Sequence, residues 1–154
     1  LLQQGEEEQA RIVALRGRKG GGEKIAQLRR EMQEAMERGC GVYREQGSMQ
    51  DAVRDVASLK QRYPDISLDD SSKVFNTEVL AALELGNMLE VAEAIAIAAA
   101  GRRESRGAHA CRDFGTRNDQ EFLHHSLMRL EAGGPQLGRK PVTITRFQPE
   151  ERKY

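Results

Sequence analysis

Residues 77–103 read TEVLAALELGNMLEVAEAIAIAAAGRR, and this stretch decides the fold. Its side chains are apolar nearly all round, which is typical of a helix with neighbours on most of its sides. Asn76 or Thr77 can accept hydrogen bonds from the first free backbone N–H groups, and Glu78 suits the positive end of the helix dipole. At 1.5 Å per residue the helix spans about 40 Å, so we expect its end to project toward other structure.

Two amphipathic segments precede this stretch. The first begins at Glu23 and is stopped by Gly39 and Gly41, and the second begins at the capping pair Ser48 and Asp51 and ends before a proline. Apolar residues recur at helical spacing in both segments: Ile25, Leu28, Met32, Ala35 and Met36 in the first, and Met49, Ala52, Val53, Val56, Leu59 and Tyr63 in the second.

Gly86 lies inside the long apolar stretch and costs about 1 kcal/mol relative to Ala, which indicates the close approach of another helix. The turn-rich residues 65–75 connect the second segment to the third, with Ile66, Leu68 and Phe75 as expected anchors. The sequence therefore predicts an all-α core, a spectrin-repeat-like three-helix antiparallel bundle over residues 23–103, with the longest helix in the centre.

Composition agrees with one small helical domain. The 154 residues match the usual domain size of about 100 to 200. The 24 Lys and Arg cancel the 24 Asp and Glu, which argues against a polybasic nucleic-acid binder. With 38% hydrophobic residues, 5% aromatics and no Trp, an aliphatic core of packed helices is favoured.

The ends of the chain carry less information. Residues 6–18 predict a short helix that leans on other structure, and the Gly-rich run over 17–22 fits a flexible linker better than a phosphate-binding loop. Cys40 and Cys111 have no second cysteine at metal or redox spacing, so both are interpreted as free thiols. The chain begins Leu1-Leu2 without Met, so we expect a fragment of a longer protein.

Periodicity fails beyond Gly107. Residues 127–130 and 142–145 predict two short strands around the turn at 132–135, that is, a short β-hairpin in an otherwise irregular tail. A helix over 118–125 is also compatible with the sequence.

The densest polar cluster is RRESRGAH, residues 102–109. Arg102 and Arg103 suit the negative end of a helix dipole, and Gly107 can serve as a left-handed cap. Glu104 lies at the unfavourable end for that dipole, so it requires a cationic partner such as Arg106. An Arg–carboxylate network that fastens the helix end to a neighbouring surface is the preferred interpretation.

Catalytic chemistry is not indicated. His109 has the right kind of pKa for a general base, but no nucleophile or paired carboxylate stands at a recognisable spacing from it. The adjacent His124 and His125 point apart on a helix or a strand, so they cannot easily hold one metal ion. We therefore expect no catalytic, cofactor-binding or metal-binding residue in these 154 positions.

Several motifs, which follow one another along the chain, resemble those of a known family. These are FNTE at 75–78, ALELGNML at 82–89, RESRGAH at 103–109, RDF at 112–114 and RND at 117–119. Together with upstream motifs at 29–33 and 40–44, they resemble the C-terminal domain of succinate dehydrogenase and fumarate reductase flavoprotein subunits, the bacterial branch in particular. The resemblance runs from about Lys19 to the end of the chain.

This resemblance implies a division of the chain into three parts. Residues 1–22 are the end of a preceding capping region plus a linker, 23–103 the helical bundle, and 104–154 a docking tail. The parent enzyme interconverts succinate and fumarate by hydride transfer to FAD, which is not held by this fragment. Partners implied are the flavin and capping domains of the same subunit and an iron-sulfur subunit, with no nucleic acid and no direct membrane insertion. The implied location is cytoplasmic, peripheral on the inner membrane.

The tail's expected role is interdomain docking, through Arg103, Glu104, Arg106, His109, Arg112 and Arg117. The length of the last helix and an unpaired Glu104 motivate this hypothesis. Two alternatives stay open from the sequence: the C-terminal domain of L-aspartate oxidase, and a free-standing helical module that binds another protein.

Overall fold

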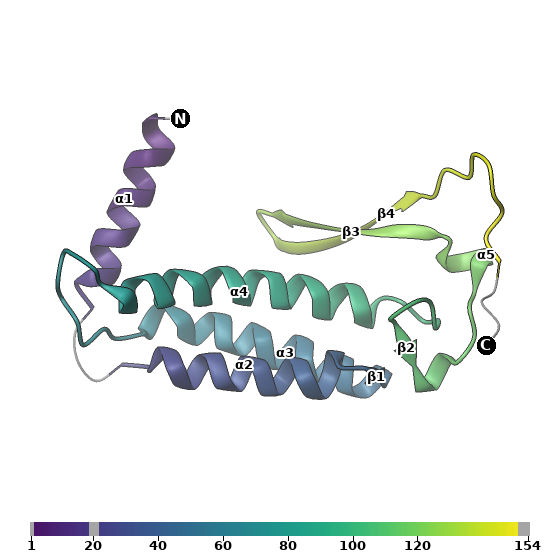
Figure 1. The fold of residues 1–154 in the computed structure, drawn as a ribbon, viewed down its shortest axis with the longest axis horizontal. Coiled ribbons are helices and arrows are strands. Elements are labelled where there is room, and N and C mark those ends of the chain that lie inside the picture. The colour runs from purple at the N-terminus through teal and green to yellow at the C-terminus, as the bar shows by residue number, and fades with distance from the viewer. Residues whose placement is uncertain (1, 19–21, 151–154) are drawn as a thin grey trace.

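A computed structural model describes residues 2–18 and 22–150, and most of these are helical (Figure 1). The helices are α1 (Leu2–Arg16), α2 (Ile25–Cys40), α3 (Gln46–Arg62), α4 (Thr77–Ala100) and the single turn α5 (Asp119–Phe122). Short 3₁₀ turns occupy Tyr63–Asp65 and Arg112–Phe114. The strands are β1 (Tyr43–Arg44), β2 (Ala110–Cys111), β3 (His124–Glu131) and β4 (Gly134–Pro141). The helical prediction therefore holds for the larger part of the described chain, and the tail contains strands, where a short β-hairpin was expected.

Helices α2, α3 and α4 lie side by side and alternate in direction (Figure 1). Their apolar faces meet in one core, whose most buried large side chains include Leu28, Val56, Leu85 and Leu89. Burying such a side chain contributes about 1.5–3 kcal/mol, so this shared core is the main source of stability. Within the described residues, no helix is both long enough and apolar enough to cross a membrane.

Helix α4 begins as predicted and ends early. The Asn76 side chain accepts a hydrogen bond from the Val79 N–H at 2.9 Å, which makes Asn76 the N-cap. The helix ends at Ala100, so Arg102 and Arg103 lie just beyond its C-terminus rather than within its last turn. Gly86 does mark a close approach, because a Cβ there would lie 2.7 Å from the Tyr63 hydroxyl.

The start of α3 differs from the prediction. The helix begins at Gln46 rather than at Ser48, and its N-cap residue Glu45 makes no side-chain capping bond. Instead the Gln46 N–H donates to the Asp113 carboxylate at 2.5 Å. A residue 67 positions away caps this helix, which local sequence rules cannot anticipate.

The connection from α3 to α4 is anchored at two of the three expected positions. Ile66 and Leu68 are buried, but Phe75 is 96% exposed with φ 54°. The Asn76 amide donates to the backbone oxygens of Asp70 and Ser72, so the loop is closed by polar contacts and Phe75 is left outside.

The tail contains the predicted hairpin in a different register. Strands β3 and β4 pair antiparallel from His124 opposite Pro141 to Glu131 opposite Gly134. Val142–Thr145, the expected second strand, follows β4 instead of forming it. The alternative helix is also partly present as α5, capped by the Asn118 side chain.

Gly107 is left-handed, with φ 58°, but it caps no helix. It lies in a tight turn in which Arg106 and His109 exchange backbone hydrogen bonds of 2.9 and 3.0 Å. The N-terminal α1 is longer than the predicted short helix and contributes the buried Leu15 to the core.

Gly39 sets the close crossing of α2 and α3. A Cβ at this position would lie 2.5 Å from both the Ala52 Cβ and the Ser48 carbonyl oxygen, whereas a Cβ at Gly47 in α3 would meet nothing within 4 Å.

We predict that Gly39→Ala lowers the free energy of unfolding by about 1–3 kcal/mol through overpacking. The matched Gly47→Ala is expected to leave it unchanged or raise it by up to about 1 kcal/mol. Urea denaturation measures the free energy of unfolding of the two variants. Equal changes in the two would contradict the close crossing of α2 and α3.

Candidate functional site

A buried carboxylate, Glu104, lies just beyond the end of α4 with its side chain 0% exposed. Its Oε1 accepts from the guanidinium of Arg102 and, at 2.8 Å, from Arg106. Its Oε2 accepts from Arg106 at 3.0 Å and from the Asn118 backbone N–H at 2.8 Å. We call Glu104, Arg102, Arg106 and Asn118, together with Asp119, the Glu104 cluster.

Both arginines of the cluster extend the contacts into the tail. Arg102 donates to the carbonyl oxygens of Phe122 at 3.0 Å and His124 at 2.6 Å, which fixes the start of β3. Arg106 donates to Asp119 at 2.5 Å. The planar guanidinium suits this task because it offers several donors in a fixed geometry. The cluster thus joins the end of α4 to α5 and to the hairpin.

The charge state of Glu104 follows from these contacts. Burial raises the pKa of its carboxyl, but hydrogen bonds from Arg106, the Asn118 N–H and Arg102 lower the pKa by more, so it lies below the ordinary 4.5. Ionised Glu104 therefore stabilises the fold above pH 4.5, and this contribution is lost as the pH falls through the folded-state pKa.

His109 connects the tail to the α2–α3 turn. The Arg44 guanidinium lies 2.8 Å from Nδ1, and Nε2 lies 3.0 Å from the Arg102 carbonyl oxygen. Because Arg44 can only donate, Nδ1 is the acceptor and Nε2 carries the proton. Burial, with further repulsion from Arg44 and Arg102, lowers the pKa of His109 below 6.5. Both ring nitrogens of the neutral His109 are engaged in contacts within the chain, so this side chain links the α2–α3 turn to the segment after α4.

The structure places four of the six residues predicted for docking in or beside the Glu104 cluster and two apart from it. Glu104 and Arg106 form the cluster, His109 adjoins it through Arg102, and Arg117 joins it by an ion pair of 2.9 Å to Asp119. Glu104 is paired with Arg102 and Arg106, as its need for a cationic partner predicted, so an unpaired Glu104 no longer motivates the docking hypothesis. The other two stand apart: Arg103 is exposed, and Arg112 pairs with Glu45 at 2.9 Å and covers the Tyr43 ring.

Sequence reasoning did not select Arg44, Asn118 or Asp119 for this site. Asn118 followed by an acidic residue is a helix-start signal, and it could have located α5. Nothing local marks the backbone N–H of Asn118 as a ligand of Glu104, 14 residues earlier.

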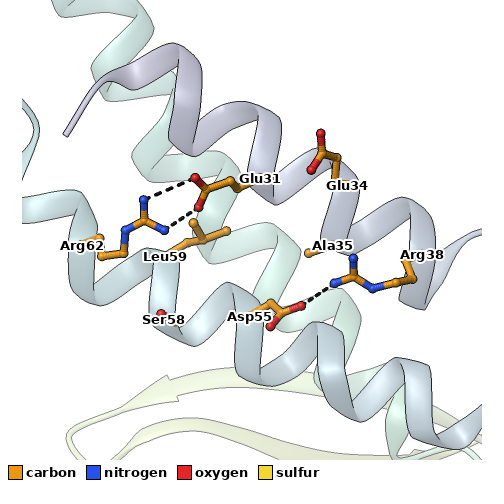
Figure 2. Close-up of a pocket in the computed structure, with 8 residues that line it drawn as sticks. All are labelled: Glu31, Glu34, Ala35, Arg38, Asp55, Ser58, Leu59 and Arg62. Atoms are coloured by element: carbon orange, nitrogen blue, oxygen red, sulfur yellow. Dashed lines mark hydrogen bonds and ion pairs between the residues drawn. The ribbon is translucent and has the colours of Figure 1, made fainter.

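Two hollows accompany these contacts. An open one of about 450 Å³ lies beside the Glu104 cluster and is lined by Arg102, Arg106, His109 and the start of β3. Another of about 230 Å³ lies between α2 and α3, where Arg62 pairs with Glu31 and Arg38 with Asp55 (Figure 2). The charged groups named here are already paired with one another. Across the residues described, no three His, Cys, Asp or Glu side chains gather as a metal site would require.

Removing the charge of Glu104 tests the role of the cluster. Glu104→Gln leaves the half-buried guanidinium of Arg102 without its carboxylate partner and leaves Arg106 with Asp119 alone, so we predict a loss of about 1.5–3 kcal/mol in the free energy of unfolding. The matched control Glu84→Gln breaks the exposed pair with Arg29 and is expected to cost at most about 1 kcal/mol. Urea denaturation at neutral pH compares them, and equal losses would refute a stabilising role for the buried carboxylate.

The sequence of this chain is similar to a protein-family model and to known proteins. Residues 29–154 match a family model described as "Fumarate reductase flavoprotein C-term". A fumarate reductase flavoprotein subunit of Haemophilus influenzae is 47% identical over 146 residues, covering 94% of this chain and 24% of that protein. One of Mycobacterium tuberculosis is 45% identical over 153 residues, covering 95% of this chain and 26% of that protein.

A solved structure shows the same arrangement. The chain is similar to a mutant form of FrdA from Escherichia coli quinol fumarate reductase, with a TM-score of 0.89 and 39% identity over 96% of this chain and 26% of that one. The chain therefore spans about a quarter of the length of the relatives it matches.

Proposed function

This chain belongs to the fumarate reductase flavoprotein C-terminal family, and from that membership we propose that it is the structural C-terminal part of a subunit that interconverts succinate and fumarate. The observation that carries the proposal is the match over residues 29–154 at 47% identity to a relative about four times longer. Matches to fumarate reductase and succinate dehydrogenase subunits favour this reading over L-aspartate oxidase.

In the proposed subunit, FAD and the groups that transfer hydride lie in the preceding polypeptide. The flavin and capping domains of the same subunit and an iron-sulfur subunit are the partners, and the assembly is peripheral on the cytoplasmic face of the inner membrane. The contacts of the Glu104 cluster support a structural role, because each charged group named in it is engaged in holding backbone segments of this chain together.

The proposed organisation keeps three parts. Residues 1–22 end the capping region, 23–103 form a spectrin-repeat-like three-helix bundle, and 104–154 dock on the flavin domain. Pairwise packing of α2, α3 and α4 supports the second part. For docking we retain Arg103, Glu104, Arg106, His109, Arg112 and Arg117. Arg103 offers exposed charge for direct contact, Arg112 is exposed but paired with Glu45, and the other four shape the segment that carries them.

Expression of the full subunit, extended upstream through its reading frame, tests the function. We predict that it binds FAD, seen by flavin absorbance, and oxidises a reduced viologen dye when fumarate is added. The 154-residue chain alone is expected to do neither, because it holds only the structural part. A full subunit without flavin and without fumarate reduction, or turnover by the short chain, would refute the proposal.

A further inference from the structure

One histidine bridges two parts of the chain that lie far apart in the sequence. The Nδ1 of His109 lies 2.8 Å from the Arg44 guanidinium, and its Nε2 lies 3.0 Å from the Arg102 carbonyl oxygen. Arg44 belongs to β1, which pairs with β2 near the C-terminal end of α4 (Figure 1). The ring of His109 therefore stands between the α2–α3 connection and the segment after α4.

Both sides of this bridge are anchored. Backbone hydrogen bonds of 2.9 and 3.0 Å between Arg106 and His109 close the tight turn that carries the ring. The Arg44 Nε donates to the Gly41 carbonyl oxygen at 3.1 Å, and the Arg44 backbone lies opposite Cys111 in the β1–β2 pair. A change in the contact between His109 and Arg44 is therefore passed on to the β1–β2 pair.

The contact with Arg44 requires a neutral imidazole. A guanidinium has only donors, so Nδ1 must be free of hydrogen to accept from it. In the imidazolium both ring nitrogens carry hydrogen, and the N–H at Nδ1 would face a positively charged donor. Protonation of His109 therefore removes this hydrogen bond and sets two like charges against each other, while the bond from Nε2 to the Arg102 carbonyl oxygen is kept.

The charges around the ring act in both directions. Burial lowers the pKa of His109, and the hydrogen bond to the Arg102 carbonyl oxygen raises it. Repulsion from the guanidinium groups of Arg44 and Arg102 lowers this pKa further, and the Glu104 carboxylate raises it. The pKa of His109 lies below 6.5 as a result, so the ring is neutral at neutral pH.

Three further groups line the hollow on the open side of the ring: Arg106, His124 and His125. Arg106 is paired with two carboxylates, and His125 is exposed. Burial lowers the pKa of His124 below 6.5 as well, so His124 is the control for His109. The pKa of Glu104 lies below 4.5, so this carboxylate remains largely ionised while the histidines titrate.

We propose that His109 is a pH-sensitive latch between the α2–α3 connection and the segment after α4. The neutral ring holds Arg44, and protonation releases Arg44 and loosens the β1–β2 pair. Because the pKa of His109 is lower in the folded chain than the ordinary 6.5, the latch stabilises the fold fully above pH 6.5. This stability is lost as the pH falls from 6.5 through the folded-state pKa. The latch acts within this chain and goes beyond the proposed function.

The thiol of Cys111 reports whether the latch is open. Cys111 is 2% exposed and lies opposite Arg44 in the β1–β2 pair, so its thiol reacts only when this region opens. The reagent is 4,4′-dithiodipyridine, which also reacts with thiols in acid. Its rate at Cys111 is measured in the full subunit by mass spectrometry, at about pH 7.5 and about pH 5.0. Variants are compared with the unchanged subunit at the same pH, so the pH dependence of the reagent cancels.

His109→Asn removes the titration and keeps an oxygen that can accept from Arg44 in place of Nδ1. We expect it to match the unchanged subunit within about twofold at the higher pH and to react at least about fivefold more slowly at the lower pH, because its latch stays closed. His124→Asn is expected to match the unchanged subunit at both pH values. Equal rates for His109→Asn and the unchanged subunit in acid, or loss of the acid response in His124→Asn, overturns the latch.

Arg44→Met decides the matter if asparagine does not close the latch, which would make His109→Asn react faster than the unchanged subunit at the higher pH. Without the guanidinium the latch is open at both pH values. We therefore expect Arg44→Met to react at least about fivefold faster than the unchanged subunit at the higher pH and at the same rate as it in acid. A ratio of the two rates that does not change with pH overturns the proposal.

Discussion

The burial of one carboxylate constrains the chain from the end of α4 to the start of the β3–β4 hairpin. An ionised group removed from water is tolerated only when charges and hydrogen bonds replace its hydration, and Glu104 obtains these from Arg102, Arg106 and the Asn118 N–H. Those partners come from both sides of the tight turn at Gly107, so the backbone over 102–118 must fold back on itself. Arg102 then fixes Phe122 and His124, from which the hairpin departs.

The helical part and the tail are joined by polar contacts near the end of α2, the start of α3 and the end of α4. Gln46 links them through its N–H, which donates to Asp113, while its side-chain amide donates to the Ala100 carbonyl oxygen at 2.8 Å and so joins the start of α3 to the end of α4. The short parallel pairing of β1 with β2 and the contact of Arg44 with His109 join the same two parts of the chain. The tail therefore caps the N-terminus of α3 through Asp113, whereas the last carbonyl group of α4 is capped by Gln46 of α3.

Predictions from sequence succeeded where the interaction is local. Helical spacing located α2, α3 and α4 because each buries one consistent face or is buried nearly all round, and Asn76 was recognisable as a cap from its position. The prediction that Glu104 needs a cationic partner, and that Arg106 could supply it, also followed from elementary electrostatics. Errors arose where distant residues decide the outcome, as for the cap of α3 by Asp113 and the exposed Phe75.

The family assignment identifies this chain as the C-terminal part of a flavoprotein subunit, in which Glu104 holds segments of the tail together. Titration of the Glu104 carboxyl carbon by NMR in the intact chain tests that central claim most directly. We predict a pKa below the ordinary 4.5, because hydrogen bonds from the three donors outweigh the cost of burial. A pKa at or above 4.5 would show that the carboxylate is not held by these contacts and would contradict the account.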